Sequence, residues 1–449
     1  MSFISPITDS EWLYFKQAGA GAVTRSVQSK LREVVSVKDF GAVGDGVTDD
    51  TAAFLAARAY VSANLPITLR IPKGVYRYTD IQNWAYSGLT IEGDSDGGSV
   101  LKCVSSAANH TALLMWAFQS GSPTDPFIQK CNLRNIRVEG NSNTLYGVRA
   151  IGLARCHWEN VTFANGKPGI GTAFQFNACS INQFNQLMCS TDYDTMSSIP
   201  HYGIVIDTGT RAGVGLGAST NNVFINAMME GVAEGVTLIS ADQNTFVGGT
   251  SESCSVRGIN ALAGARFNTF IGHALEANTT YDVLDAGFYN QYINCYSLGN
   301  FVFQGLGCQI NGGIYQRIEV QGGATKNIIE NITIKYVSGA GGFIDNGDAT
   351  EWKNLYDQQA ATYIYPLKPR VNIVVGASPF TYQNMSRQYQ EVVFQSGTLT
   401  SVDRVRDGVS FSAPTITPNS IWLAPLESLI VTYSVAPAMS YLPHNGFQG

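Results

Sequence analysis

Hydrophobic and polar positions repeat along the middle of the chain with a period of 22 to 24 residues. In each repeat, an Asn is followed two positions later by an aromatic residue and then by a β-branched residue. This motif begins at Asn222, Asn244, Asn268 and Asn290, spaced 22, 24 and 22 residues apart. Such a repeat predicts a coil of short parallel strands, in which aromatic rings stack and Asn side chains hydrogen-bond between successive coils. Weaker copies at Asn135, Asn160, Asn182, Asn327 and Asn331 extend the pattern. We therefore predict an all-β chain whose middle two thirds form one parallel β-helix.

The pattern changes near residue 371, where alternating segments separated by Gly, Pro and Asn replace the long repeat. Segments 390–397, 409–414 and 428–437 have the period of two that is typical of strands in an antiparallel sheet. Pro366 and Pro369 mark the boundary. We predict a β-helix body over residues 37–370 and a small C-terminal antiparallel β-sandwich over residues 371–449.

Residues 1–36 form a separate segment with a Gly/Ala stretch at 18–22. No Lys-Ser/Thr pair follows this stretch, so it is a poor phosphate loop. We interpret it as a flexible joint between a short anchoring segment and the body.

Residues 37–60 predict a strand, a glycine-rich turn and then a helix that Thr48 or Asp49 begins. The helix has an apolar stripe, and such an amphipathic helix can cover the open end of a solenoid. The stripe consists of Ala53, Phe54, Ala57 and Val61. Four acids in this region are predicted to be turn and capping residues rather than catalysts, namely Asp39, Asp45, Asp49 and Asp50.

Two motifs carry a family resemblance. Residues 39–50 read Asp-Phe-Gly-Ala-Val-Gly-Asp-Gly-Val-Thr-Asp-Asp, and residues 71–76 read Ile-Pro-Lys-Gly-Val-Tyr. Together they resemble the N-terminal signature of the pectate-lyase-like superfamily, in particular of bacteriophage tailspike proteins with polysaccharide depolymerase activity. Residues 22–33 are similar to the joint that links tailspike particle-binding segments to their bodies.

This resemblance implies a right-handed parallel β-helix, a homotrimer and a place in the virion tail. It further implies attachment to a phage tail or baseplate protein through residues 1–36, and binding or cleavage of a capsule or O-antigen at the host cell surface. The C-terminal module would trimerise the chain, bind carbohydrate, or both. The fold also hosts lyases, hydrolases, epimerases and pure binders, so the chemistry has to come from a site.

Charge and cysteine usage narrow the function classes. The net charge is −6 and no basic block exists, which argues against nucleic-acid binding. The eight cysteines lack a CxxC pair or a zinc-ligand spacing, so we expect buried thiols, assembly in the bacterial cytoplasm, and neither a metal nor another cofactor. The N-terminus does not resemble a signal peptide and no stretch approaches the ~20 apolar residues of a membrane span. We expect no membrane insertion, and release by lysis.

Three glutamates define the main candidate site. Counting eight residues from the repeated Asn reaches Glu230, Glu252 and Glu276, which should stack on one flank of consecutive coils about 4.8 Å apart. Glycoside hydrolysis needs two carboxyls, and this spacing suits either stereochemical course. Stacked like charges also raise the pKa of one another, which would keep one acid protonated. The alternative is that these side chains only end strands in water.

Residues near the glutamates suggest how a sugar would be held. Arg257, Arg266, His273 and Tyr281 fall within the same two coils, where Arg could bind a sugar carboxylate and Tyr281 could stack on a pyranose. A lone His such as His273 is more often a structural residue. The interval between Asn182 and Asn222 is 40 residues and holds further candidates: Asp192 and Asp194 as carboxyls, and Arg211 as a binding residue.

Three functions remain open at this stage. The first is an endo-glycosidase that uses two of the three glutamates. The second is a polysaccharide lyase that uses a cation and a base drawn from Arg257, Arg266, His273 and Tyr281. The third is a trimeric receptor-binding protein that grips the glycan without cutting it. Pectin is not the expected substrate, since neither the Asp cluster of calcium pectate lyases nor the polygalacturonase motif set occurs in the repeats.

Overall fold

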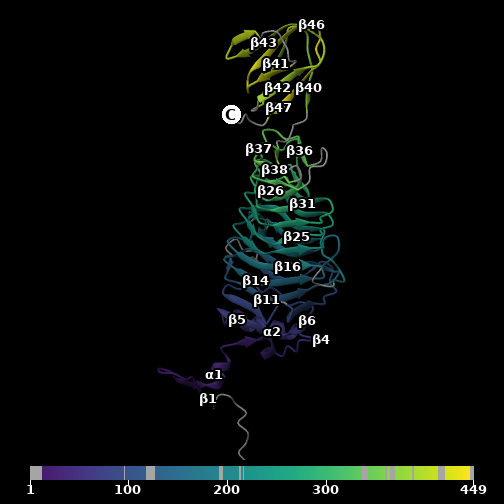
Figure 1. Ribbon diagram of the computed structural model, residues 1–449. Coiled ribbons are helices and arrows are strands. Elements are labelled where there is room, and N and C mark those ends of the chain that lie inside the picture. The colour runs from purple at the N-terminus through teal and green to yellow at the C-terminus, as the bar shows by residue number, and fades with distance from the viewer. Residues whose placement is uncertain are drawn as a thin grey trace, which may run out of the picture. The chain divides into compact units, whose positions relative to one another are not determined.

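The computed structural model describes residues 13–444 apart from 96, 118–126, 192–195, 212–213, 216, 336–341, 359–361, 365–369, 387–388 and 413–419. The chain forms two compact units. One comprises residues 1–189, 194–201 and 209–215, and the other comprises residues 190–193, 202–208 and 216–449. Figure 1 shows the strands of both units in successive coils.

The first unit consists mainly of parallel strands in three sets, in which each strand pairs with the strand of the next coil. The first set contains β3 (Val35–Ser36), β5 (Ile67–Ile71), β7 (Leu89–Gly93), β11 (Asn132–Glu139), β14 (His157–Ala164) and β16 (Gln183–Ser190). The second contains β4 (Asp45–Asp49), β6 (Gly74–Tyr78) and β8 (Ser99–Cys103) and continues onto the end of β11. The third contains β9 (His110–Trp116), β12 (Thr144–Ile151) and β15 (Thr172–Asn177). Short pairs are the parallel β10 (Ile128–Gln129) with β13 (Leu153–Ala154), and the antiparallel β1 (Tyr14–Lys16) with β2 (Thr24–Ser26) and β18 (Thr210–Arg211) with β19 (Val214–Gly215).

Helix α2 (Thr51–Ala63) is the predicted amphipathic helix. Its buried residues are the four predicted, Ala53, Phe54, Ala57 and Val61. The Phe54 ring contacts the rings of Tyr76, Tyr78 and Trp84, which are all buried. The helix begins two or three residues later than predicted, because residues 45–49 form β4. The other helices are short, α1 (Val27–Leu31) and the 3₁₀ helix η2 (Val37–Phe40).

The four acids of this region make turns and caps, as predicted. The Asp39 carboxylate accepts from the backbone N–H of Ser36 in a capping box. The Asp45 side chain accepts from the backbone N–H groups of Val47 and Thr48, while Asp50 accepts from those of Val43 and Gly44. These hydrogen bonds lower the pKa of Asp45 and keep its carboxylate charged.

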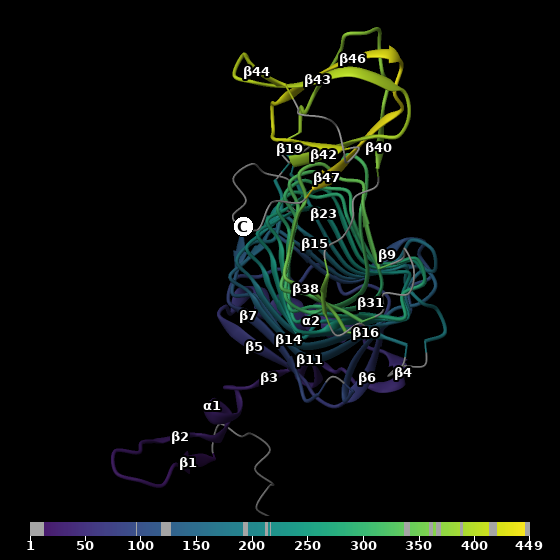
Figure 2. The ribbon, with the colours of Figure 1, turned by 45° about the horizontal axis from the view of Figure 1, so that its top comes forward.

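The second unit contains a parallel β-helix with three strand positions per coil, which we call the first, second and third sets. The first set is β21 (Val223–Ile225), β24 (Thr245–Val247), β27 (Thr269–Ile271), β30 (Gln291–Ile293), β32 (Gln309–Asn311), β34 (Ile328–Glu330) and β37 (Glu351–Lys353). The second is β22 (Met228–Glu230), β25 (Thr250–Glu252), β28 (Ala274–Glu276), β35 (Thr333–Ile334) and β38 (Leu355–Asp357), with the starts of β31 (Tyr296–Phe303) and β33 (Ile314–Val320). The third is β17 (Tyr202–Asp207), β23 (Glu234–Asp242), β26 (Arg257–Arg266), β29 (Tyr281–Asp285) and β36 (Phe343–Asp345), with the ends of β31 and β33. Two short strands complete the coils, β20 (Ser219–Thr220) beside β23 and β39 (Thr362–Ile364) beside β38. Figure 2 shows β23, β31 and β38 around these coils.

The predicted ladders of Asn and aromatic side chains are confirmed. Asn222, Asn244, Asn268 and Asn290 are buried, and each side-chain amide donates to the Oδ1 of the next at 2.8, 3.0 and 3.1 Å. The rings of Phe224, Phe246, Phe270 and Tyr292 stack with centroids 4.5, 4.6 and 5.3 Å apart and planes within 10° of parallel. These contacts align the first-set strands of four consecutive coils.

The C-terminal region is the predicted antiparallel β-sandwich. One four-stranded sheet has the order β40 (Val371–Ile373), β47 (Met439–His444), β42 (Tyr389–Phe394) and β45 (Ser420–Leu423). The other has the order β41 (Phe380–Gln383), β46 (Ser428–Val435), β43 (Thr398–Arg406) and β44 (Val409–Ser412). Apolar residues of both sheets share one core, which includes Phe394, Val402 and Val431.

Candidate functional site

The predicted register of the three glutamates is confirmed. Glu230 at the end of β22 pairs with Glu252 at the end of β25, and Glu252 pairs with Glu276 at the end of β28. The preceding residues Met229, Ser251 and Leu275 are buried in the coil, and side chains alternate along a strand. We call these three aligned residues the glutamate column.

The members of the glutamate column differ in exposure. Glu230 is 5% exposed, and its Oε2 accepts a hydrogen bond of 2.5 Å from Ser190 Oγ. The backbone N–H of Thr191 also donates to the Glu230 carbonyl oxygen, so this segment covers the first glutamate. Glu252 and Glu276 are half-buried. The part of the column that a ligand can reach is therefore the pair Glu252 and Glu276.

A second polar column lies at the starts of the third-set strands, four or five residues beyond the glutamates. Tyr202, Glu234, Arg257 and Tyr281 are in register on β17, β23, β26 and β29. Glu234, Arg257 and Tyr281 each follow a short corner after a second-set strand, so the two columns flank the same corner. We call these four residues the corner column. It contains Arg257 and Tyr281, two of the predicted binding residues.

Glu234 holds the corner column together and was not predicted. It is 6% exposed, and its carboxylate accepts from Arg257 Nη1 at 2.6 Å, Thr237 Oγ1 at 2.8 Å and Asn260 Nδ2 at 2.9 Å. A buried carboxylate is stable only with partners of this kind. Burial raises the pKa of Tyr202, with a further contribution from the charge of Glu234. The corner thus presents a fixed cation beside Tyr281.

His273 lies inside the coil. It is fully buried, with Nε2 3.0 Å from Ser251 Oγ and Nδ1 2.9 Å from the Gly248 carbonyl oxygen. Its ring packs edge-on against Phe270. Burial lowers the pKa of His273 to about 4, so the imidazole is neutral near pH 7. His273 therefore supports the interior of the coil and does not line a surface that a ligand could reach.

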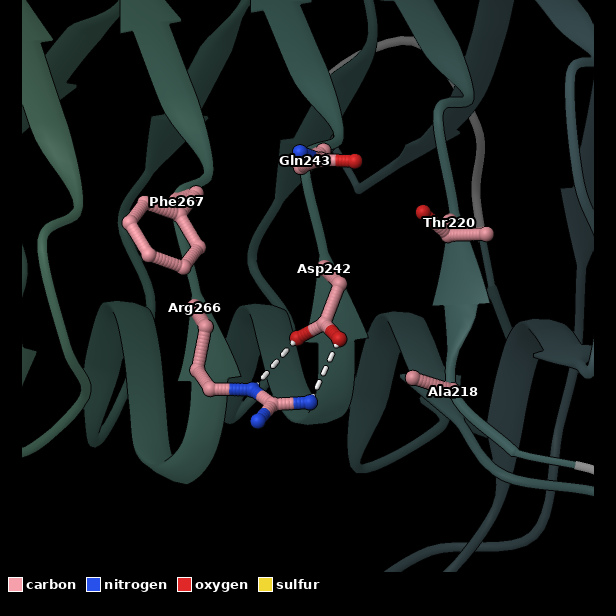
Figure 3. Close-up of a pocket in the computed structure, with 6 residues that line it drawn as sticks. All are labelled: Ala218, Thr220, Asp242, Gln243, Arg266 and Phe267. Atoms are coloured by element: carbon pink, nitrogen blue, oxygen red, sulfur yellow. Dashed lines mark hydrogen bonds and ion pairs between the residues drawn. The ribbon is translucent and has the colours of Figure 1, made fainter.

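Arg266 lies at the other end of its strand from the corner column. It forms a two-point ion pair with Asp242, with N···O distances of 2.9 and 2.6 Å (Figure 3). A pocket of about 410 Å³ adjoins the pair and is lined by Ala218, Thr220, Asp242, Gln243, Arg266 and Phe267. Since β23 separates Asp242 from Glu234 by eight residues, the pocket lies roughly 25 Å from the corner column. The structure does not bring Arg266 together with the glutamates.

Three other predicted residues cannot be placed in the site. Asp192 and Asp194 lie outside the described residues. Arg211 has its backbone in β18, paired with Val214, and its side chain also lies outside what the structure describes.

Two further acids are buried near the columns but serve the coil. Asp282 accepts from Ser297 Oγ and the Gly299 N–H at 2.7 and 2.6 Å, and Asp285 accepts from Tyr292 OH at 3.0 Å. Burial raises the pKa of both carboxyls. Across the described ranges, no group of three or more His, Cys, Asp or Glu side chains has the geometry to hold a metal ion. None of the helices described above has the length and apolarity needed to cross a bilayer.

These features define a parallel β-helix protein with an accessible pair of aligned carboxyls beside a fixed cation. Residues 34–260, just over half of the chain, match the family described as rhamnogalacturonase A/epimerase, pectate lyase-like. The chain belongs to this family, and the resemblance of its N-terminal motifs to the pectate-lyase-like superfamily is confirmed.

Individual relatives share shorter stretches with the chain. It is 54% identical over 50 residues to the tail spike protein of an Escherichia phage, which is 11% of this chain and 6% of that protein. It is 34% identical over 117 residues to mannuronan C5-epimerase AlgE1 of Azotobacter vinelandii, covering 24% of this chain and 8% of the epimerase. The chain thus matches less than a tenth of the length of either protein.

Among solved structures, DFA-IIIase from Arthrobacter chlorophenolicus A6 has the same fold. The TM-score is 0.53 at 10% sequence identity, over 74% of this chain and 96% of that one.

Proposed function

We propose that the chain is a phage tailspike that binds a bacterial surface polysaccharide, a capsule or O-antigen, and cuts it as an endo-glycosidase. The observation that carries the proposal is the alignment of Glu252 with Glu276 beside the corner column. The identity with a phage tail spike protein over 50 residues supports the biological setting. The family contains polysaccharide-active enzymes by its description.

The backbones of Glu252 and Glu276 lie one strand apart, which permits the carboxyl spacing of a retaining glycosidase. Neighbouring strands are about 4.8 Å apart, and retaining enzymes hold their carboxyls at about 5 Å. One carboxylic acid would protonate the glycosidic oxygen as its bond to the anomeric carbon breaks. The other carboxylate would attack that carbon, and water would then release the sugar with the first residue acting as base.

The corner column would orient the sugar. Arg257 is paired with Glu234 and its side chain is 26% exposed, so its guanidinium can also reach a carboxylate on an acidic sugar. Tyr281 is half-buried and in register with Arg257, and its ring can pack on a pyranose face. Asp192, Asp194 and Arg211 are proposed as additional contributors from the long interval between the repeats.

The wider setting is proposed from the tailspike similarity. Residues 1–36 would attach the chain to a phage tail or baseplate protein, residues 37–370 would form the body, and residues 371–449 would trimerise the chain or bind carbohydrate. The assembled homotrimer would be made in the bacterial cytoplasm and would act from the virion at the surface of the next host.

A panel of purified capsules and O-antigens tests the activity. New reducing ends without the ultraviolet absorbance of an unsaturated sugar indicate a hydrolase. Glu252→Gln and Glu276→Gln should each lower turnover at least about 100-fold with little change in melting temperature. Glu330→Gln is the matched control, since Glu330 is a half-buried glutamate on β34, outside the column. Full activity in both column variants would refute this assignment.

A lyase is the second candidate, favoured by Arg257 and Tyr281 in the corner column. A cation beside a phenol suits abstraction of the proton next to a sugar carboxylate, the step from which elimination begins. Absorbance of unsaturated ends that disappears in Tyr281→Phe, with the glutamate variants active, would select this reaction. Binding without either product would select a non-catalytic receptor-binding protein.

A further inference from the structure

Two aromatic side chains form an exposed stack at a different corner of the coil from the glutamates. Phe267 and Tyr289 are 52% and 40% exposed, yet their rings lie parallel within 7° with centroids 5.3 Å apart. They occupy equivalent positions in consecutive coils, directly after the pair Arg266 and Phe288. They add nothing to the core, so their role lies on the surface.

The backbone at these positions makes aromatic residues an unfavourable choice. Phe267 and Tyr289 both have φ of 56°, as do Asn221 and Gln243 at the equivalent positions of the preceding coils. This left-handed conformation favours Asn, whereas a bulky residue in it is strained. Strained residues that persist without a packing benefit point to function.

A polar pair and a pocket lie beside this stack. The pocket of about 410 Å³ is lined by Phe267, Gln243 and the Arg266–Asp242 ion pair, among others. Figure 3 shows the Phe267 ring broadside next to that ion pair, with Gln243 and Thr220 on the neighbouring coils. The Arg266 side chain is 53% exposed and the Asp242 side chain 23%, so both can reach a ligand. On the other side, a Cβ at Gly307 would lie 2.4 Å from Tyr289 Cε1, which means that the next coil packs closely on that ring. A ligand would therefore approach from the pocket.

We propose that Phe267, Tyr289, Arg266, Asp242 and Gln243 form a second carbohydrate subsite, which binds one pyranose unit of the polymer. The C–H face of the sugar would pack on the aromatic stack. Asp242 would accept from sugar hydroxyls, while Arg266 and the Gln243 amide would donate to them. The stack consists of two rings, with Gln243 and Gly307 at the equivalent positions on either side, so we infer room for a single sugar unit.

This inference rests on the proposed function for the identity of the polymer and adds an anchoring role to it. The subsite lies at the far end of β23 from Glu234, roughly 25 Å away, so it would hold the chain of sugars outside the cleavage site. Its loss should therefore raise KM on long polymers and leave kcat unchanged.

Saturation-transfer NMR on the full chain tests the subsite, with methyl pyranosides of glucose, galactose and mannose and the polysaccharide panel as probes. Phe267→Asn and Tyr289→Asn place the residue of Asn221 at the strained positions, so folding should be retained or improved. Transfer to sugar C–H protons is expected in the wild type, and binding should weaken about tenfold in either variant. Glu330→Gln, which leaves the stack intact and lies outside the glutamate column, should bind as the wild type does.

Several outcomes would overturn the subsite. They are wild-type binding in both Asn variants, absence of transfer with every probe, or a change of oligomeric state in the variants with sugar binding unaltered. The two proposals fail separately. Polymer cleavage with unchanged KM in Phe267→Asn removes the subsite alone, whereas pyranoside binding at the stack with full cleavage by the Glu252→Gln and Glu276→Gln variants removes the catalytic pair alone.

Discussion

Replacement of Asn268 by Ala tests the idea that the buried Asn ladder stabilises the coil. Asn268 Oδ1 accepts from the backbone N–H and from Nδ2 of Asn244, both at 3.0 Å, and Asn268 Nδ2 donates to the Ala241 carbonyl oxygen at 2.8 Å. The Ala variant leaves the Asn244 N–H with no acceptor at a fully buried position, which costs about 1–3 kcal/mol. The other lost bonds contribute about 1 kcal/mol each. We expect local stability to fall by at least about 3 kcal/mol.

Hydrogen exchange measures this loss locally, which suits a coil whose parts can open separately. A loss of 3 kcal/mol corresponds to exchange about 150-fold faster, since about 1.4 kcal/mol is a factor of ten. Peptides that contain Asn244 should show this change. Asn300→Ala is the matched control, because its side chain makes a single exposed hydrogen bond of 2.9 Å to the Thr280 carbonyl oxygen. Exchange less than tenfold faster in Asn268→Ala would refute the role of the ladder.

Three further predictions concern buried groups. Burial lowers the pKa of His273 from 6.5 to about 4, so on acidification this side chain takes up a proton in the unfolded chain before it does so in the folded one. The free energy of unfolding should therefore not depend on His273 above pH 6.5. It should fall by up to about 3 kcal/mol between pH 6.5 and 4. Urea unfolding of His273→Gln should lack that part of the pH dependence, and an identical profile would contradict it. All eight cysteines lie in the described ranges, where they form no disulfide and are buried, so a thiol reagent should label none of them in the native protein and all of them in denaturant; rapid native labelling would contradict their burial. Glu234→Gln removes the counterion of Arg257 and should destabilise the second unit by about 1–3 kcal/mol in urea unfolding, whereas unchanged stability would show that the ion pair contributes little.

The repeating part of the fold could be predicted from the sequence because one period determines several contacts at once. When Asn222 aligns with Asn244, the aromatic residues and the glutamates must align too, so the register of the glutamate column followed from counting. The capping helix was also predictable, since its apolar stripe at Phe54 and its neighbours is local information. The first residue of this helix could not be predicted, because residues 45–49 form β4 and pair with β6.

The surroundings of the site depend on contacts that the period does not encode. Ser190 covers Glu230 from the far side of the long interval, and nothing in the repeat predicts that contact. Glu234 was missed because it follows Glu230 by four residues, whereas Arg257 and Tyr281 follow their glutamates by five. Alignment of the third-set strands instead of the Asn residues would have found it. Arg266 was assigned to the glutamate site because it is close to the glutamates in sequence. It lies at the end of the long strand β26, whereas Arg257 lies at the start of that strand beside the glutamates.

The Asn ladder also bears on how such a chain changes its length. Residues 244–267 make up one full turn of the coil, and their removal would place Asn222 against Asn268 and Phe224 against Phe270, so both ladders would keep their partner types. Gene duplication or excision of that unit would thus lengthen or shorten the protein and leave the fold of the remaining coils unchanged. Excision would also delete Glu252 and set Glu230 beside Glu276, so one event could change both the length of the protein and its candidate catalytic pair.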